Sequence, residues 1–272
     1  MTTLLSRFDF ICFDWKGTLE GKGGNKHARE QKALDTVKKE ISPLGHDPIM
    51  FENIYRQKKR EQKEREEKTH ATFTVKELLE SVLDAAHISS DITRNRVINT
   101  FIRQYMSLEN SNATKMLPGW KKILRLIQNN NVPLCLLRNS TLTGPEFQKK
   151  IDSVGAGEFF TWDTNIILSG ETGFQKPHPS VFRAAVQKCF PDGEEPSRVL
   201  FIGNETEADV IGSNNMGWTS VLIRTTEKSS NGKADYEIDN LMELKDIIFM
   251  EDDSSEYTSD DSSDWNSSED DE

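Results

Sequence analysis

Several polar residues of this 272-residue chain directly follow apolar runs. Asp14 ends the run that begins at Phe8, Arg138 and Asn139 follow "VPLCLL", and Asn204 follows "RVLFIG". A carboxylate such as Asp14 can act as a nucleophile that divides one difficult reaction step into two easier ones. In open α/β sheets, sites lie at the carboxyl ends of the strands. We therefore expect these residues to share one site.

The elements that would position this site follow from the hydrophobic pattern. Continuous apolar runs, typical of buried parallel strands, occur at residues 8–14, 132–137, 198–203 and 219–223. Helical patterns lie between them, at residues 119–130 and 179–190. Strands that alternate with helices predict an α/β fold, with a Rossmann-like parallel sheet covered on both faces.

A long segment interrupts this alternation. Residues 23–115 contain helical, charge-rich stretches, including 52–70 and 74–88, and no convincing strand. We interpret the segment as an inserted helical cap domain. The α/β core then comprises residues 1–22 and 116–250.

The net charge of −11 is distributed unevenly. Residues 251–272 hold eleven Asp and Glu and no Lys or Arg, so the other 250 residues carry 34 basic and 34 acidic side chains. A segment this poor in apolar residues cannot offset its chain entropy, and we expect a disordered acidic tail. The tail could serve solubility or bind a protein partner. It disfavours a nucleic-acid partner, because its charge repels phosphates.

The hydropathy pattern indicates no association with a membrane. No run approaches 18 consecutive apolar residues, and the first eight residues hold no apolar segment of signal length. A soluble, cytoplasmic protein is the expectation.

The ordered set of motifs resembles the haloacid dehalogenase (HAD) superfamily, in particular its helical-cap subfamily of phosphoglycolate-phosphatase-like enzymes. The resemblance covers about residues 8–250. It is carried by "FDWKGTL", "LPGW", "RNS", "GFQKPHPSVF" and "FIGNETEADVIGSNNMGWTSVLI", in this order. No one of these strings is specific alone, whereas their combination is.

The resemblance implies a role for each matching position. Asp14 stands where the family has the nucleophile that forms an aspartyl-phosphate, and Lys176 matches the lysine that screens charge there. Lys16 replaces the Asp that protonates the leaving group and activates water. The positions implied to bind phosphate or the metal are Gly17, Thr18, Arg138, Asn139, Asn204 and Asp209. Among these, Arg138 replaces a Ser or Thr, and Asn204 replaces the first of two acidic metal ligands.

These replacements change the charge expected in the site. Asp14 and Asp209 face Lys16, Lys176 and Arg138, a net charge of +1. An ammonium about 4 Å from a divalent ion is repelled by roughly 8 kcal/mol at an effective dielectric constant of 20. We expect a site that accepts anions and rejects divalent cations, although an active enzyme of this family would need Mg²⁺ held by Asp14, Asn204 and Asp209.

Alternatives remain open at this stage. Lys16 could point into solvent or act as a desolvated general base, and Glu205 or Glu207 could replace the missing carboxylate. The first hypothesis is a phosphatase that acts on a small phosphate monoester with impaired or altered catalysis. The second is a non-catalytic relative that binds a phosphorylated ligand or a protein partner. Dehalogenation is a third, disfavoured by the cationic residues.

Overall fold

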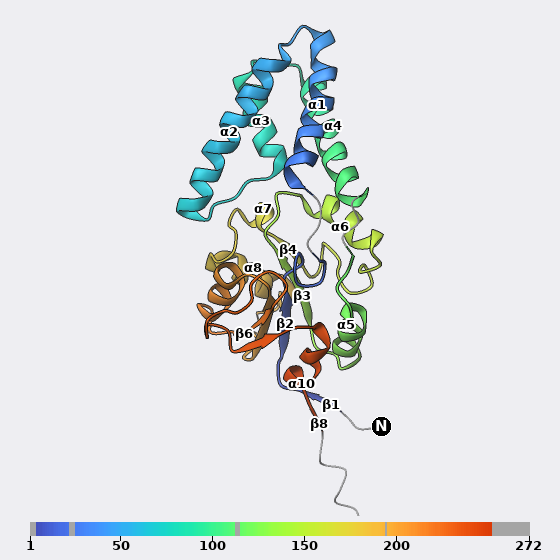
Figure 1. The fold of residues 1–272 in the computed structure, drawn as a ribbon, viewed down its shortest axis with the longest axis vertical. Helices are drawn as coiled ribbons and strands as arrows, with labels where there is room; N and C mark the ends of the chain where they lie inside the picture. The colour runs from blue at the N-terminus through green and yellow to red at the C-terminus, as the bar shows by residue number, and fades with distance from the viewer. Residues whose placement is uncertain (1–3, 22–24, 112–114, 194, 252–272) are drawn as a thin grey trace, which may run out of the picture.

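A six-stranded parallel sheet forms the centre of the lower half of the molecule in Figure 1. The computed structural model describes residues 4–21, 25–111, 115–193 and 195–251. The strand order is β4 (Ile166–Leu168), β3 (Leu134–Arg138), β2 (Phe10–Phe13), β5 (Val199–Gly203), β6 (Thr219–Ile223) and β7 (Tyr236–Ile238). Every neighbouring pair is parallel. The predicted α/β class is confirmed.

The central strands are buried on both faces, as their continuous apolar sequences predict. In β2, Ile11 and Phe13 belong to one hydrophobic cluster, and Phe10 and Cys12 belong to the other. This alternation follows from the two-residue period of a strand. The runs predicted as strands are β2, β3, β5 and β6. Strand β4 was not predicted, because its three residues are too few to show a pattern and its pairing depends on β3.

Helices cover both faces of the sheet. Helix α5 (Trp120–Asn129) packs into the first hydrophobic cluster, and α8 (Pro179–Cys189) packs into the second. The remaining helices of this half are α6 (Gly144–Ser153), α7 (Ser169–Thr172), η2 (Thr206–Ile211), α9 (Gly212–Asn214), η3 (Leu241–Glu243) and α10 (Leu244–Ile248). The helices predicted over residues 119–130 and 179–190 are confirmed.

Four further helices stand above the sheet in Figure 1: α1 (Lys26–Ile41), α2 (Pro48–Thr69), α3 (Val75–Ala85) and α4 (Asp91–Ser111). A short helix, η1 (Ser42–Leu44), follows α1. They face the edge where the parallel strands end. Residues 25–111 contain no strand. The bounds of the inserted cap, 23–115, stay a prediction, because residues 22–24 and 112–114 lie outside the described residues.

The two ends of the described chain pair with each other. Strand β1 (Leu4–Ser6) is antiparallel to β8 (Phe249–Glu251), at the base of the molecule in Figure 1. Glu251, assigned from the sequence to the acidic tail, belongs to β8 instead. The rest of the predicted tail, residues 252–272, lies outside the described residues.

Among the residues that the structure describes, no helix combines the length and the apolar character needed to cross a membrane.

Candidate active site

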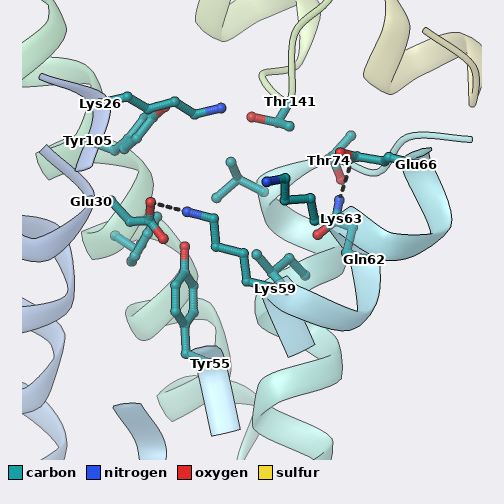
Figure 2. A pocket seen from close by; sticks show the side chains of 13 residues that line it. Lys26, Glu30, Tyr55, Lys59, Gln62, Lys63, Glu66, Thr74, Tyr105 and Thr141 are labelled. Atoms are coloured by element: carbon teal, nitrogen blue, oxygen red, sulfur yellow. Dashed lines mark hydrogen bonds and ion pairs between the residues drawn. The ribbon is translucent and has the colours of Figure 1, made fainter. Parts of the chain in front are cut away.

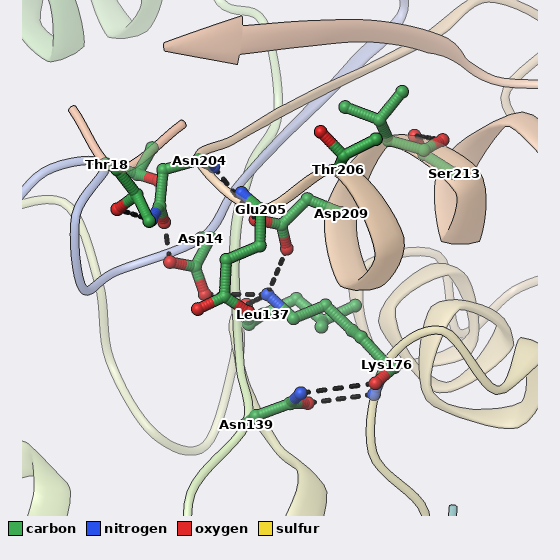
Figure 3. A network of polar contacts seen from close by, with 12 residues as sticks. Asp14, Thr18, Leu137, Asn139, Lys176, Asn204, Glu205, Thr206, Asp209 and Ser213 are labelled. Carbon is green, nitrogen blue, oxygen red and sulfur yellow. Dashed lines mark hydrogen bonds and ion pairs between the residues drawn. The ribbon is translucent and has the colours of Figure 1, made fainter. Parts of the chain in front are cut away.

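The side chain of Lys176 connects two buried carboxylates at the carboxyl edge of the sheet. Its Nζ donates to Oδ1 of Asp14 at 2.6 Å and to Oδ1 of Asp209 at 2.7 Å (Figure 3). Lys176 also donates to the backbone oxygen of Leu137 at 3.2 Å. Asp14 follows β2, Asp209 lies in η2 after β5, and Lys176 comes from the loop before α8. Three segments far apart in the sequence thus supply one charged cluster.

The backbone around these residues is fixed by side-chain hydrogen bonds. Asn139, after β3, accepts from the backbone N–H of Lys176 at 2.8 Å and donates to its carbonyl at 3.3 Å. Oδ2 of Asp209 accepts from the backbone N–H groups of Asn204 and Glu205, at 2.9 and 3.0 Å. Asn139 therefore positions Lys176, and Asp209 closes the turn that leads from β5 into η2.

Burial and charge shift the pKa values of this cluster. Asp14 is 7% exposed, and burial, opposed by Lys176 and reinforced by Asp209, raises the pKa of its carboxyl to about 6. Burial acts against the charge of Lys176, but Asp14 and Asp209 outweigh it and raise the pKa of the ammonium. Lys176 is thus a cation at all physiological pH values, whereas Asp14 changes charge close to neutrality.

Thr18 and Asn204 border Asp14 on the side away from Lys176. Oγ1 of Thr18 lies 3.4 Å from Oδ2 of Asp14 and 3.2 Å from Oδ1 of Asn204, so its single proton can be donated to either. Nδ2 of Asn204 donates to Oγ1 of Thr226 at 2.6 Å. These contacts fix the Asn204 amide with its oxygen toward Thr18. Asn204 therefore supplies a neutral oxygen where the family resemblance implies a carboxylate.

Gly17 is the position where the chain turns most tightly beside the site. It has φ +90°, and a Cβ placed on it would lie 2.4 Å from Nδ2 of Asn204. Its carbonyl accepts a hydrogen bond from Oγ1 of Thr225. Only glycine allows this conformation and this approach together.

Arg138 and Lys16 line a cavity of about 250 Å³ between the sheet edge and helices α1, α2 and α4. Arg138 is 9% exposed, and its guanidinium lies 4.7 Å from the ring centre of Phe147 in α6. Lys16 is half-buried. Asn139, which also lines the cavity, links it to Lys176 through the hydrogen bonds described above. The cavity next to the site is thus lined by cationic side chains.

The oxygen donors can be compared with the needs of Mg²⁺, which takes oxygen ligands including one or two carboxylates. Both oxygens of Asp209 accept hydrogen bonds from Lys176, Asn204 and Glu205, and Oδ1 of Asp14 accepts from Lys176. Oδ2 of Asp14 and Oδ1 of Asn204 remain. Within the described residues, no group of three or more His, Cys, Asp or Glu side chains could hold a metal ion. The two remaining side-chain oxygens, of Asp14 and Asn204, are thus one carboxylate oxygen and one amide oxygen, which carry a single negative charge between them.

The proposed replacements for the lost carboxylate, Glu205 and Glu207, are both exposed. The Glu205 side chain points toward Asp14 and Lys176 in Figure 3. Glu205 also interacts with the rest of the protein beyond its backbone contact to Asp209. Glu205 is therefore an acidic side chain that could supplement Asp14.

The structure contains a buried polar network behind the site that was not predicted from the sequence. Oε2 of Glu20 accepts from Nε1 of Trp15 and from Nζ of Lys150, both at 2.8 Å. The Trp15 ring packs edge-on against Phe147, which in turn lies under Arg138. This chain of contacts supports the loop that carries Asp14 and Lys16. A lysine 130 positions from its carboxylate gives no local signal in a sequence.

A comparison with models of protein families identifies the family of this chain. The model described as haloacid dehalogenase-like hydrolase matches residues 49–223. The chain belongs to this family. The resemblance inferred from the motifs is confirmed.

Two curated relatives of this HAD-like chain are phosphatases. The glyceraldehyde 3-phosphate phosphatase of Methanothermobacter thermautotrophicus is 29% identical over 107 residues, which cover 37% of this chain and 45% of the relative. The ribulose-1,5-bisphosphate 5-phosphatase of Halopiger xanaduensis is 26% identical over 143 residues, 49% of this chain and 56% of the relative. The chain thus matches about half the length of these proteins.

Solved structures agree in fold. The 2-haloacid dehalogenase of Pseudomonas syringae pv. Tomato superimposes with a TM-score of 0.62 at 17% identity, over 88% of this chain and 97% of that protein. At this identity the likeness establishes the HAD fold and leaves the activity to the site residues.

Proposed function

We propose that this HAD-like chain binds a small phosphorylated molecule through its phosphate group and that any hydrolysis at Asp14 is slow. The observation that carries the proposal is the cluster of Asp14, Lys176 and Asp209 beside a cavity lined by Lys16 and Arg138. This cluster and the cationic residues beside it support binding of a phosphate, whereas position 16 carries Lys16 and no acid/base carboxylate.

The phosphate would be bound by charge and by geometry. Arg138 offers a planar guanidinium that can donate two parallel hydrogen bonds to phosphate oxygens. Its stacking on Phe147 fixes the plane of that group. Lys16 lines the same cavity and adds positive charge next to Asp14. Both groups favour an oxyanion at the end of β2 and β3.

Covalent chemistry at Asp14 would begin with attack of a carboxylate oxygen on phosphorus, which breaks the bond to the ester oxygen and forms an aspartyl-phosphate. The departing alkoxide then needs a proton, and water needs a base to release the phosphate. A positioned acid/base contributes about 10² to 10⁴-fold to such steps. The family assigns both proton transfers to a carboxyl group, and position 16 carries the amino group of Lys16 in its place.

The charges of the site residues also affect whether the protein would bind a magnesium ion. A magnesium ion would neutralise charge on the transferred phosphoryl group. Here Lys176, Arg138 and Lys16 supply positive charge from side chains, and Asp14 and Asn204 offer a single negative charge to a metal. We expect the protein to bind phosphate without a resident magnesium ion.

The non-catalytic alternative is favoured by the same replacement of the acid/base residue. Hydrolysis of p-nitrophenyl phosphate, measured with and without Mg²⁺, distinguishes a slow phosphatase from a non-catalytic phosphate-binding protein. Weak activity that Asp14→Asn abolishes supports a slow phosphatase. Activity that is absent from the wild type and present only in Lys16→Asp supports a phosphate-binding protein that has lost catalysis. Failure of inorganic phosphate to bind in isothermal titration calorimetry, with no hydrolysis by either protein, contradicts the proposal.

A further inference from the structure

The cavity at the sheet edge continues into the helices of the cap. The inner lobe, described above, has a volume of about 250 Å³, and an outer lobe of about 220 Å³ lies among α1, α2, α3 and α4. Four residues line both lobes: Lys26, Glu66, Tyr105 and Thr141. The two lobes therefore lie side by side and share part of their walls.

The combined cavity has a large excess of positive charge. Its cationic side chains are Lys16, Lys26, Arg29, Lys59, Lys63 and Arg138, and its carboxylates are Glu30 and Glu66. The surplus is four positive charges. Two of the cations, Arg29 and Arg138, are more than nine-tenths buried. Like charges gathered in a cleft with low-dielectric walls create a strong field, which attracts ligands of opposite charge.

One phosphate monoester neutralises about half of this surplus, because it carries roughly −1.5 to −2 charge at pH 7. We propose that the ligand is a small molecule with two phosphate groups, one held in the inner lobe and the other in the outer lobe. This inference rests on the proposed function, since the first phosphate occupies the site beside Asp14.

Three lysines would bind the second phosphate. Figure 2 shows the amino groups of Lys26, Lys59 and Lys63 directed into the space enclosed by the outer lobe. Lys59 contacts Glu30, whose side chain is 9% exposed. Lys63 is largely exposed and has its nearest acidic partner, Glu67, one helical turn away at 3.6 Å. The Lys63 ammonium can therefore turn to an anion at little cost.

Aromatic rings form part of the wall of the outer lobe. Tyr55, Phe101 and Tyr105 line the outer lobe and pack on each other, with ring centres 5.5 and 6.2 Å apart. The Arg29 guanidinium lies 5.2 Å from the ring centre of Tyr105. Their apolar faces can contact the carbon skeleton of a ligand while its charged ends reach the cations. A short, bis-phosphorylated sugar matches this arrangement.

Calorimetric titration of the full chain with ribulose 1,5-bisphosphate and with ribulose 5-phosphate tests the inference, because the two probes differ by one phosphate. We expect the bisphosphate to bind at least tenfold more tightly. Lys59→Met and Lys63→Met should each lower the affinity for the bisphosphate toward that for the monophosphate. Neither variant should change the affinity for the monophosphate. If Lys59→Met fails to fold after losing its pair with Glu30, Lys63→Met still tests the second phosphate site, because Lys63 is exposed.

Lys76→Met is the matched control, because Lys76 on α3 has an i,i+4 pair with Glu80, as Lys63 has with Glu67, and does not line either lobe. It should change neither affinity. Equal binding of the two sugars, or an equal loss of both in Lys63→Met, overturns the second phosphate site alone. Absence of binding by ribulose 5-phosphate and inorganic phosphate, or affinities that Arg138→Met leaves unchanged, contradicts the proposed function itself.

Discussion

The Nζ atom of Lys176 lies 2.6 Å from Oδ1 of Asp14, and both side chains are buried. A carboxylate in this position is useful as a nucleophile only when it is ionised. Because the pKa of Asp14 is raised to about 6, mainly by burial, the ionised fraction increases between pH 5 and pH 7. We expect any Asp14-dependent hydrolysis of an aryl phosphate to rise with pH through about 6. Initial rates from pH 4 to 8, with Asp14→Asn as the blank, check this, and a rate that falls over this range would contradict it.

The same shift predicts the pH dependence of stability. A carboxyl group whose pKa is higher in the folded protein than its ordinary value of 3.8 binds its proton more tightly in the folded state. Its contribution to stability is therefore present below about pH 4 and is lost as the pH rises through about 6. Asp14→Asn should lose less unfolding free energy than the wild type between pH 4 and pH 7 in urea titrations. The exposed Asp163→Asn is the control and should follow the wild type.

Restoring carboxylates should restore metal-dependent chemistry. The double variant Lys16→Asp with Asn204→Asp replaces a cation by an acid/base group and adds a second ligand charge beside Oδ2 of Asp14. We expect hydrolysis of p-nitrophenyl phosphate to increase by about 10²-fold or more in the presence of Mg²⁺, the lower end of the contribution of a positioned acid/base. Calorimetric titration with MgCl₂ should show binding to the double variant only. Tight magnesium binding by the wild type would refute the charge argument.

Substitution of Gly17 by alanine should destabilise the protein for two reasons that can be measured separately. A side chain at φ +90° is strained by about 1–3 kcal/mol, and a Cβ there would also collide with Asn204. Gly155 has φ +72° and no atom within 4 Å of the same position, so Gly155→Ala measures the conformational strain alone. We expect Gly17→Ala to lower the free energy of unfolding more than Gly155→Ala does, and to weaken phosphate binding. Equal losses in the two variants would show that the Asn204 contact adds nothing.

Lys150 should be important for stability although it lies outside the site. Its pair with Glu20 is buried, with the two side chains 3% and 2% exposed. Removal of one partner of a buried ion pair costs about 3–5 kcal/mol. Lys150→Met should therefore lose that amount in urea unfolding, whereas the neighbouring exposed Lys149→Met should stay within about 0.5 kcal/mol of the wild type. A small effect in both would mean that the other contacts of Glu20, Trp15 among them, are enough to stabilise its carboxylate.

The sequence by itself determined the class of fold and most of its elements. Strand β2 and its neighbours are recognisable because a parallel strand buried on both faces must be apolar at every position, which leaves a continuous run in the sequence. Helix α8 is recognisable by Pro179 and Ser180 at its start, because proline fits the first turn. The family followed from the order of the motifs, and the replacements at positions 16, 138 and 204 were visible without coordinates.

Only the tertiary structure decided how these residues meet. The contacts of Lys176 with Asp14 and Asp209 join positions 162 and 33 residues apart, and long-range pairing of this kind leaves no local pattern. The raised pKa of Asp14 likewise depends on burial, which is a property of the packed fold. The cationic lobe among the cap helices was hidden for the same reason: in the sequence Lys59 and Lys63 are part of a mixed-charge helix, and their common cavity with Arg29 arises because α1, α2 and α4 pack around it.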